Sequence, residues 1–189
     1  MHNLLDGLLL YHGSYCEVKE PDLEKCAKRK DFGQGFYLTS SKEQAESFLK
    51  TSIVKAIATG KIENNQNYGY ISTFEVKLSK ELKVQVFEEA DVDWLHCVAA
   101  HRKKRIFAEV EREMSKYDVI VGKIADDATN TTLTAYLSGA FGTVGDKEAD
   151  DFCIKQLLPN KLKDQYCFKT ENAVKCLRFV EGEKKCLKS

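Results

Sequence analysis

Tyr11-His12-Gly13-Ser14 and, one polar loop later, Phe32-Gly33-Gln34-Gly35-Phe36-Tyr37 are the most informative segments of this sequence. The apolar run at 8–11 predicts a short buried strand that ends at the histidine. The glycines of the second segment favour a turn that leads into another strand at 36–39. The sequence therefore pairs a strand-end histidine with a tyrosine framed by glycines.

Several later signals predict where helices begin and end. Ser40 and Glu43 form a capping box that predicts a helix start, and Gly60 is typical of a left-handed helix end. Asp91 and Thr170 are predicted to cap two further helices. Strands are expected at 70–78, 82–87, 117–124, 165–168 and 177–180, and helices at 133–141 and 147–158. Short strands mixed with scattered helices, without regular βαβ spacing, predict an α+β fold.

The composition is typical of one soluble domain, 1–189. The 189 residues fit the usual size of a single domain, and 29 basic residues balance 29 acidic ones. No overall field therefore favours nucleic acid or an anionic membrane. Seven cysteines, without a Cys-x-x-Cys pair, are expected to be reduced thiols. The apolar runs are too short for a signal peptide or a membrane span, so we expect a cytoplasmic location.

Two polar clusters near the helix that Asp91 begins have competing interpretations. The run 101–105, His-Arg-Lys-Lys-Arg, is interpreted as a solvated helix end rather than an RNA-contacting patch. Cys97 and His101, with His96 adjacent, have the i,i+4 spacing of metal ligands. Because two ligands without a second cluster make a weak zinc site, we expect packing here and no metal.

The two opening segments resemble the ADP-ribosyltransferase superfamily, in the branch of diphtheria toxin and the poly(ADP-ribose) polymerases. Members carry a histidine in a Trp/Tyr-His-Gly-Ser/Thr segment and a tyrosine in a Phe-Gly-x-Gly-hydrophobic-Tyr segment. A second aromatic follows that tyrosine by eleven residues, where this chain has Phe48. Ser41, Lys42 and Ala45, between the two aromatics, also match. The whole chain resembles an uncharacterised bacterial family of single-domain members, which implies the split antiparallel sheets and flanking helices of the ADP-ribosyltransferase fold.

The resemblance implies an NAD site. His12 is expected to hydrogen-bond a hydroxyl of the adenosine ribose, and the Gly13 backbone to pair with the nicotinamide carboxamide, with Ser14 nearby. A glycine there lets the ligand approach closely. Tyr37 and Phe48 are expected to enclose the nicotinamide ring. Taken singly, these residues have structural explanations as a strand-end histidine and core aromatics, and it is their combination at the family spacing that favours the NAD site.

Gln165 is where the sequence departs from the family. Relatives place a catalytic glutamate at the start of a late strand, and the matching segment is 163–168, Lys-Asp-Gln-Tyr-Cys-Phe. A glutamate stabilises the positive charge that develops on the ribose, whereas a glutamine keeps only hydrogen bonding. The expected catalytic set is Gln165 with His12 and Tyr37, and Gln165→Glu is expected to raise turnover. The neighbouring Asp164 points to the opposite strand face and is a poor substitute.

The expected function is that of a toxin-like, NAD-dependent mono-ADP-ribosyltransferase. It would transfer ADP-ribose from NAD, its substrate, to a protein or nucleic-acid acceptor and release nicotinamide. One alternative is a degenerate module that binds NAD or ADP-ribose without turnover. Another is an NAD-dependent RNA 2′-phosphotransferase, which needs paired basic residues in the site. The resemblance also implies a neutralising partner protein. Asp126 would either orient an acceptor or compensate for Gln165, or else Asp126 and Asp127 would only cap the loop into the next helix.

Overall fold

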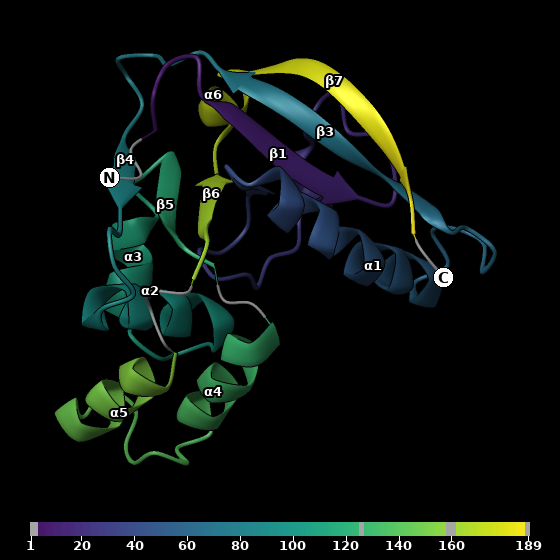
Figure 1. The fold of residues 1–189 in the computed structure, drawn as a ribbon. Coiled ribbons are helices and arrows are strands. Elements are labelled where there is room, and N and C mark those ends of the chain that lie inside the picture. Colours follow the sequence, from purple (N-terminus) through teal and green to yellow (C-terminus); the bar gives the residue numbers. More distant parts are fainter. Residues whose placement is uncertain (1–3, 125–126, 158–161, 188–189) are drawn as a thin grey trace.

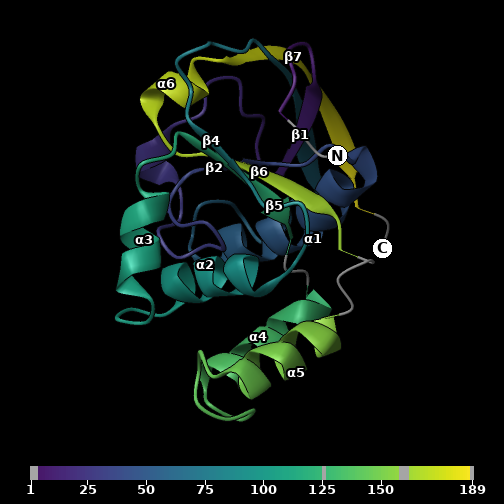
Figure 2. The same cartoon turned by 90° about the vertical axis from the view of Figure 1, so that its left-hand side faces the viewer.

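The computed structural model describes residues 4–124, 127–157 and 162–187. Within them the chain forms two β-sheets with helices around them, so the predicted α+β class is confirmed (Figures 1 and 2). The three-stranded sheet has the order β1 (Leu9–Ser14), β3 (Tyr68–Val76), β7 (Leu177–Cys186). The four-stranded sheet has the order β2 (Phe36–Leu38), β6 (Asp164–Phe168), β5 (Val119–Lys123), β4 (Val84–Val86).

All neighbouring strands are antiparallel except β4 and β5, which are parallel. β1 pairs with β3 over its whole length, as far as the pair Ser14 and Tyr70. His12 consequently lies inside β1, and the expectation of a strand ending at this residue is wrong. A bridge from Tyr11 to Thr39, with N–O distances of 2.8 and 3.0 Å, joins the two sheets beside it.

Helix α1 (Lys42–Ala58) packs against β1 and β3. Its N-terminal cap is Ser41 rather than Ser40, because the Ser41 hydroxyl accepts a hydrogen bond from the backbone N–H of Gln44 at 3.2 Å. At the other end the backbone of Gly60 has a φ of +67°, and its N–H donates to the Ile57 carbonyl. The predicted left-handed cap at Gly60 is confirmed.

Two other predicted caps are also confirmed. The Asp91 carboxylate accepts from the Trp94 N–H at the start of α2 (Val92–Arg102), and the Thr170 hydroxyl accepts from the Ala173 N–H at α6 (Glu171–Val174). The remaining helices are the 3-10 turn η1 (Leu23–Lys25), α3 (Ala108–Met114), α4 (Asp127–Leu137) and α5 (Lys147–Leu157). α4 and α5 lie side by side, beyond α2 and away from both sheets (Figures 1 and 2).

Besides a small cluster of Ala45, Leu49 and Ile71 between α1 and β3, two hydrophobic cores hold these layers. One lies between the four-stranded sheet and the helices, around the fully buried Trp94, whose indole N–H donates to the Lys123 carbonyl at 3.1 Å. The other lies between the two sheets, around Leu10, Phe36 and Phe168. The second core keeps β1 against β2, which places His12 beside Tyr37. In the part of the chain that the structure describes, no helix has the length and apolar character of a membrane span.

Candidate functional site

A cavity of about 530 Å³ opens where β1, β2, β6 and α1 meet. Its walls include every residue that the sequence assigned to the site, namely His12, Gly13, Ser14, Tyr37, Phe48 and Gln165. They come from parts of the chain up to 153 residues apart, from position 12 to position 165. The volume falls in the usual range of small-molecule and cofactor sites.

His12 faces the cavity with a fixed orientation. Its Nδ1 lies 2.8 Å from the Tyr37 carbonyl oxygen, and because a carbonyl only accepts, Nδ1 carries the proton and donates. Burial lowers the pKa of the imidazole, the Tyr37 carbonyl partly opposes this, and the charge of Lys30 lowers it further. His12 is therefore a neutral ring at pH 7 whose Nε2 is a hydrogen-bond acceptor.

Gly13 lines the cavity, but helix packing explains why it is a glycine. A Cβ at this position would lie 1.9 Å from the backbone oxygen of Ala45. Any side chain would thus push the first turns of α1 away from β1. The close approach of a helix is thus a structural reason for this glycine, and the expected close approach of a ligand stays a prediction.

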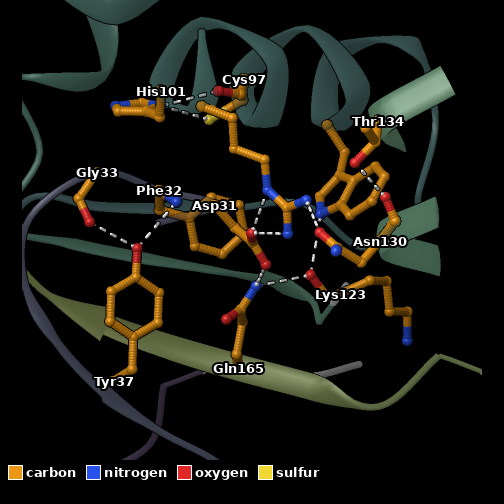
Figure 3. A network of polar contacts seen from close by, with 12 residues as sticks. Asp31, Phe32, Gly33, Tyr37, Cys97, His101, Lys123, Asn130, Thr134 and Gln165 are labelled. Atoms are coloured by element: carbon orange, nitrogen blue, oxygen red, sulfur yellow. Dashed lines mark hydrogen bonds and ion pairs between the residues drawn. The ribbon is translucent and has the colours of Figure 1, made fainter. Parts of the chain in front are cut away.

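Tyr37 is anchored by its hydroxyl group. The hydroxyl donates to the Gly33 carbonyl at 2.8 Å and accepts from the Phe32 N–H at 2.9 Å (Figure 3). Burial raises the pKa of this phenol well above its usual value, so it stays protonated and can donate. Gly33 has a φ of +84°, and a Cβ there would lie 2.7 Å from the His101 ring. The glycine turn and the tyrosine therefore hold one another in place, with the half-buried ring on the cavity wall.

Gln165 is 4% exposed and uses its amide nitrogen for both of its hydrogen bonds. Nε2 donates to the Asp31 carboxylate at 2.8 Å and to the Lys123 carbonyl at 3.0 Å. Both partners are acceptors, which fixes the orientation of the amide and puts Oε1 on the side of Tyr37 (Figure 3). A glutamate at 165 would meet a second carboxylate, so the expectation that Gln165→Glu raises turnover no longer follows.

Asp31 is a member of the site that sequence reasoning missed. Its carboxylate is 6% exposed and lines the cavity beside Gln165. Its Oδ1 accepts from Arg102 Nε at 2.9 Å and from Nη2 at 2.6 Å. The local signal was its position directly before the Phe-Gly-Gln-Gly turn, because Arg102 and Gln165 stand 71 and 134 residues away from it in the sequence.

Arg102 is not the solvated helix end that the sequence suggested. Its side chain is 18% exposed, and besides Asp31 it binds the Asn130 side chain through Nη1 at 2.8 Å. The last residue of α2 therefore reaches into the cavity wall. The interpretation of the 101–105 run as surface charge is wrong for this residue.

The cavity carries more positive than negative charge. Lys30, Lys55 and Lys61 line it together with Arg102, and among the described lining residues the acidic one is Asp31. Desolvation lowers the pKa of the Lys30 ammonium, and the neighbouring Lys55 charge lowers it further. Such a cavity attracts an anionic ligand.

Asp164, Cys97 and His101 are not among the residues that line this cavity. Asp164 pairs with the Lys123 ammonium at 2.9 Å, on the strand face opposite to Gln165. Cys97 and His101 touch each other at 3.8 Å, but the ring nitrogen also lies 2.8 Å from the Cys97 carbonyl oxygen, and burial raises the pKa of the Cys97 thiol to about 12. Asp126 lies outside the described residues. Asp127 is the first residue of α4, and its side chain is likewise not described.

Comparison with known families gives a match over most of the chain. A family model described as "Protein of unknown function (DUF3990)" matches residues 8–179. This span begins just before β1 and ends within β7, so it contains all the cavity residues named above. No curated protein matches the chain.

Proposed function

This chain belongs to the DUF3990 family of proteins of unknown function, and we propose that it is an NAD-dependent mono-ADP-ribosyltransferase-like protein. The observation that carries the proposal is that His12, Tyr37, Phe48 and Gln165 line one cavity. These residues are the ones that the resemblance to the ADP-ribosyltransferases selects. In this proposal the two sheets, whose neighbouring strands are antiparallel except for β4 and β5, correspond to the split sheets of that superfamily.

The nicotinamide half of NAD lies between Tyr37 and Phe48 in the proposed complex. Both rings are half-buried and line the cavity. Stacking on an aromatic ring contributes about 1–3 kcal/mol in nucleotide-binding sites. The neutral His12 ring accepts, through Nε2, a hydrogen bond from a hydroxyl of the adenosine ribose.

The pyrophosphate of NAD supplies the negative charge that the cavity lacks. Lys30 and Lys55 lie close enough for their charges to lower the pKa of Lys30. An anion between the two ammonium groups relieves their repulsion, so the positive charge of the cavity favours binding of the pyrophosphate. The tight packing of Gly13 against α1 keeps the helix that carries Lys55 against β1.

The proposed reaction breaks the bond between C1′ of the ribose and the nicotinamide nitrogen. Its electron pair leaves with nicotinamide, and the acceptor then forms a new bond to C1′. A protein or nucleic-acid group is the acceptor. We propose a cytoplasmic location, supported by the seven cysteines, all described and none in a disulfide. A neutralising partner protein is part of the same proposal.

A second candidate deserves a test because of Arg102. The RNA 2′-phosphotransferase reaction needs paired basic residues in the site, and Arg102 and Lys30 both line the cavity. A 2′-phosphorylated oligoribonucleotide therefore belongs in the assay. The third candidate, an NAD-binding module without turnover, differs only in releasing no nicotinamide.

The deciding experiment measures NAD binding by calorimetry and nicotinamide release by chromatography, with and without cell extract as a source of acceptor. We expect binding and slow release. Phe48→Ala should weaken binding, while Phe152→Ala, a change to an exposed phenylalanine on α5, should not. Absence of NAD binding to the wild-type protein would refute the proposal, and binding without release would leave the binding module. Dephosphorylation of the oligoribonucleotide would favour the phosphotransferase.

A further inference from the structure

We infer that Asp31 supplies the carboxylate that position 165 lacks, and that Gln165 is its positioning residue. In this assignment the Asp31 carboxylate stabilises the positive charge that develops on the ribose of the nicotinamide half as the glycosidic bond breaks. The inference rests on the proposed function. It goes beyond it by naming a catalytic residue that neither the motifs nor the resemblance selects.

The first support is distance. Gln165 Nε2 lies 2.8 Å from Asp31 Oδ2, so the carboxylate stands one hydrogen bond away from the position where relatives carry a glutamate. Both residues line the cavity and both are more than nine-tenths buried. A charge placed there acts through a partly desolvated space, in which electrostatic stabilisation is strong.

The second support is rigidity. Asp31 directly precedes Phe32 and Gly33, the residues whose backbone N–H and carbonyl hold the Tyr37 hydroxyl at 2.9 and 2.8 Å (Figure 3). The carboxylate and the ring proposed to stack on nicotinamide thus belong to one fixed unit. Preorganised groups of this kind need little rearrangement when charge develops.

The third support is the chemistry of the partners. Gln165 and Arg102 both donate to Asp31, through Nε2, Nε and Nη2. A glutamate at 165 would oppose Asp31, whereas a glutamine complements it. The residue that looks like a lost catalytic group is therefore the residue that Asp31 requires. Because Arg102 neutralises part of the charge, turnover should be slow.

In the proposed reaction step the Asp31 carboxylate acts as the base. The C1′–N bond breaks, and its electron pair neutralises the nicotinamide nitrogen as nicotinamide departs. The ribosyl cation next to the carboxylate is attacked by an acceptor hydroxyl or by water. The proton of that hydroxyl passes to the Asp31 carboxylate and then to solvent.

The test exchanges the carboxylate and the amide between positions 31 and 165. Asp31→Asn should lower nicotinamide release about 100-fold, with NAD affinity changed by less than about three-fold. The double variant Asp31→Asn/Gln165→Glu keeps one carboxyl and one amide but exchanges their positions. It should recover at least about ten-fold over Asp31→Asn. Asp164→Asn, a change to the buried carboxylate that pairs with Lys123 on the opposite strand face, is the matched control and should release nicotinamide like wild type.

Each outcome either supports or overturns the assignment of Asp31. Loss in Asp31→Asn with recovery in the exchanged pair supports the inference, since a merely structural role gives no recovery by charge exchange. Wild-type release by a folded Asp31→Asn protein that binds NAD overturns it. Loss without recovery in a folded double variant also overturns it. If wild type binds NAD but releases no nicotinamide with extract, this inference fails and NAD binding survives, whereas no NAD binding defeats the proposed function itself.

Discussion

His12 donates a hydrogen bond through Nδ1 to the backbone carbonyl of Tyr37 at 2.8 Å, and so links the two sheets at the cavity. Residues of the first sheet and of the second are thereby fixed relative to each other. The same bond assigns the tautomer of the imidazole. Both candidate ligand contacts, the Nε2 lone pair and the Tyr37 ring, depend on it.

The pH dependence of NAD binding should reflect the protonation of the His12 imidazole. Because the pKa of the buried imidazole is lowered, affinity should stay constant above pH 6.5 and fall only as the pH drops through that lowered pKa. Stability should change in the same direction. The unfolded chain takes up a proton near pH 6.5 that the fold resists, so the folded protein loses stability below that pH.

The measurement is calorimetric titration with NAD between pH 8 and pH 5. His12→Gln should lower affinity by about 2- to 10-fold and remove this pH dependence. His101, whose pKa burial also lowers, is retained in that variant and serves as the internal control. A variant that keeps the full pH dependence would show that another group is responsible.

Gly13→Ala should destabilise the protein by about 1–3 kcal/mol, because the new Cβ would meet the Ala45 carbonyl at 1.9 Å and backbone must move. Urea denaturation measures this directly. Gly7→Ala is the contrast: its φ is +77° with nothing within 4 Å of the added Cβ, so it isolates backbone strain from collision. An equal cost for the two variants would contradict the collision at Gly13.

Local signals explain which parts of the fold the sequence predicted. Asp91 and Thr170 cap their helices through neighbours three residues away, and Gly60 ends α1 through its own backbone. Such contacts are encoded in short segments. α4 ends at Leu137 instead of the predicted 141 because Gly139, two residues further on, has a left-handed φ of +84°. Its start at Asp127, six residues before the predicted one, had no clear apolar signal.

Long-range contacts explain what the sequence did not predict. β7 continues to Cys186 through a charged stretch, since β3 supplies its partners from Tyr68 onward. α3 escaped prediction because its sequence, Ala-Glu-Val-Glu-Arg-Glu-Met, has no clear apolar period. Asp31 and Arg102 looked like surface charges, and only the packing of α2 against the glycine turn makes them a buried pair. Pairings of this kind have no local signature.

Lys55→Gln should weaken binding of NAD and ADP-ribose about equally and leave nicotinamide unaffected, because Lys55 lines the part of the cavity proposed for phosphate. The effect should shrink at high salt, since screening weakens the contribution of an exposed cation. Lys50→Gln, another exposed lysine of α1 outside the cavity lining, is the matched control. Equal losses from both variants in competition binding would refute a specific phosphate contact.

Tyr37→Phe and Tyr37→Ala should separate anchoring from stacking. Tyr37→Phe leaves the Phe32 N–H and the Gly33 carbonyl without the hydroxyl, which costs about 1–3 kcal/mol of stability. It keeps the ring, so NAD affinity should fall less than in Tyr37→Ala, for which we expect a loss of about 5- to 150-fold. Thermal denaturation and calorimetry give the two quantities, with Tyr70→Phe on β3 as the control. Identical NAD affinities for wild type and Tyr37→Ala would eliminate ring stacking.

Gln165→Glu should lower rather than raise the stability of the protein at neutral pH. The new carboxylate would stand at the 2.8 Å distance that now joins the Gln165 amide to Asp31. Two carboxylates so close cannot both remain ionised, so the pKa of the pair is raised above the unfolded value of about 4.3 for glutamate. The folded variant then holds a proton that the unfolded chain releases. Its deficit relative to wild type therefore grows as the pH rises above the unfolded value and disappears as the pH falls through that value.

Urea denaturation of wild type and Gln165→Glu from pH 4 to pH 8 measures this deficit. Gln165→Ala is the control, because it removes the same hydrogen bonds without adding a charge, so its deficit should not share this pH dependence. The geometry predicts that Gln165→Glu alone gains no nicotinamide release near pH 7, since its extra carboxyl group is protonated or paired with Asp31 through one proton. A gain of ten-fold or more at pH 7, without a pH-dependent loss of stability, would mean that Asp31 does not oppose a carboxylate at 165. The hydrogen bond between Gln165 and Asp31 would then have no role in organising the site.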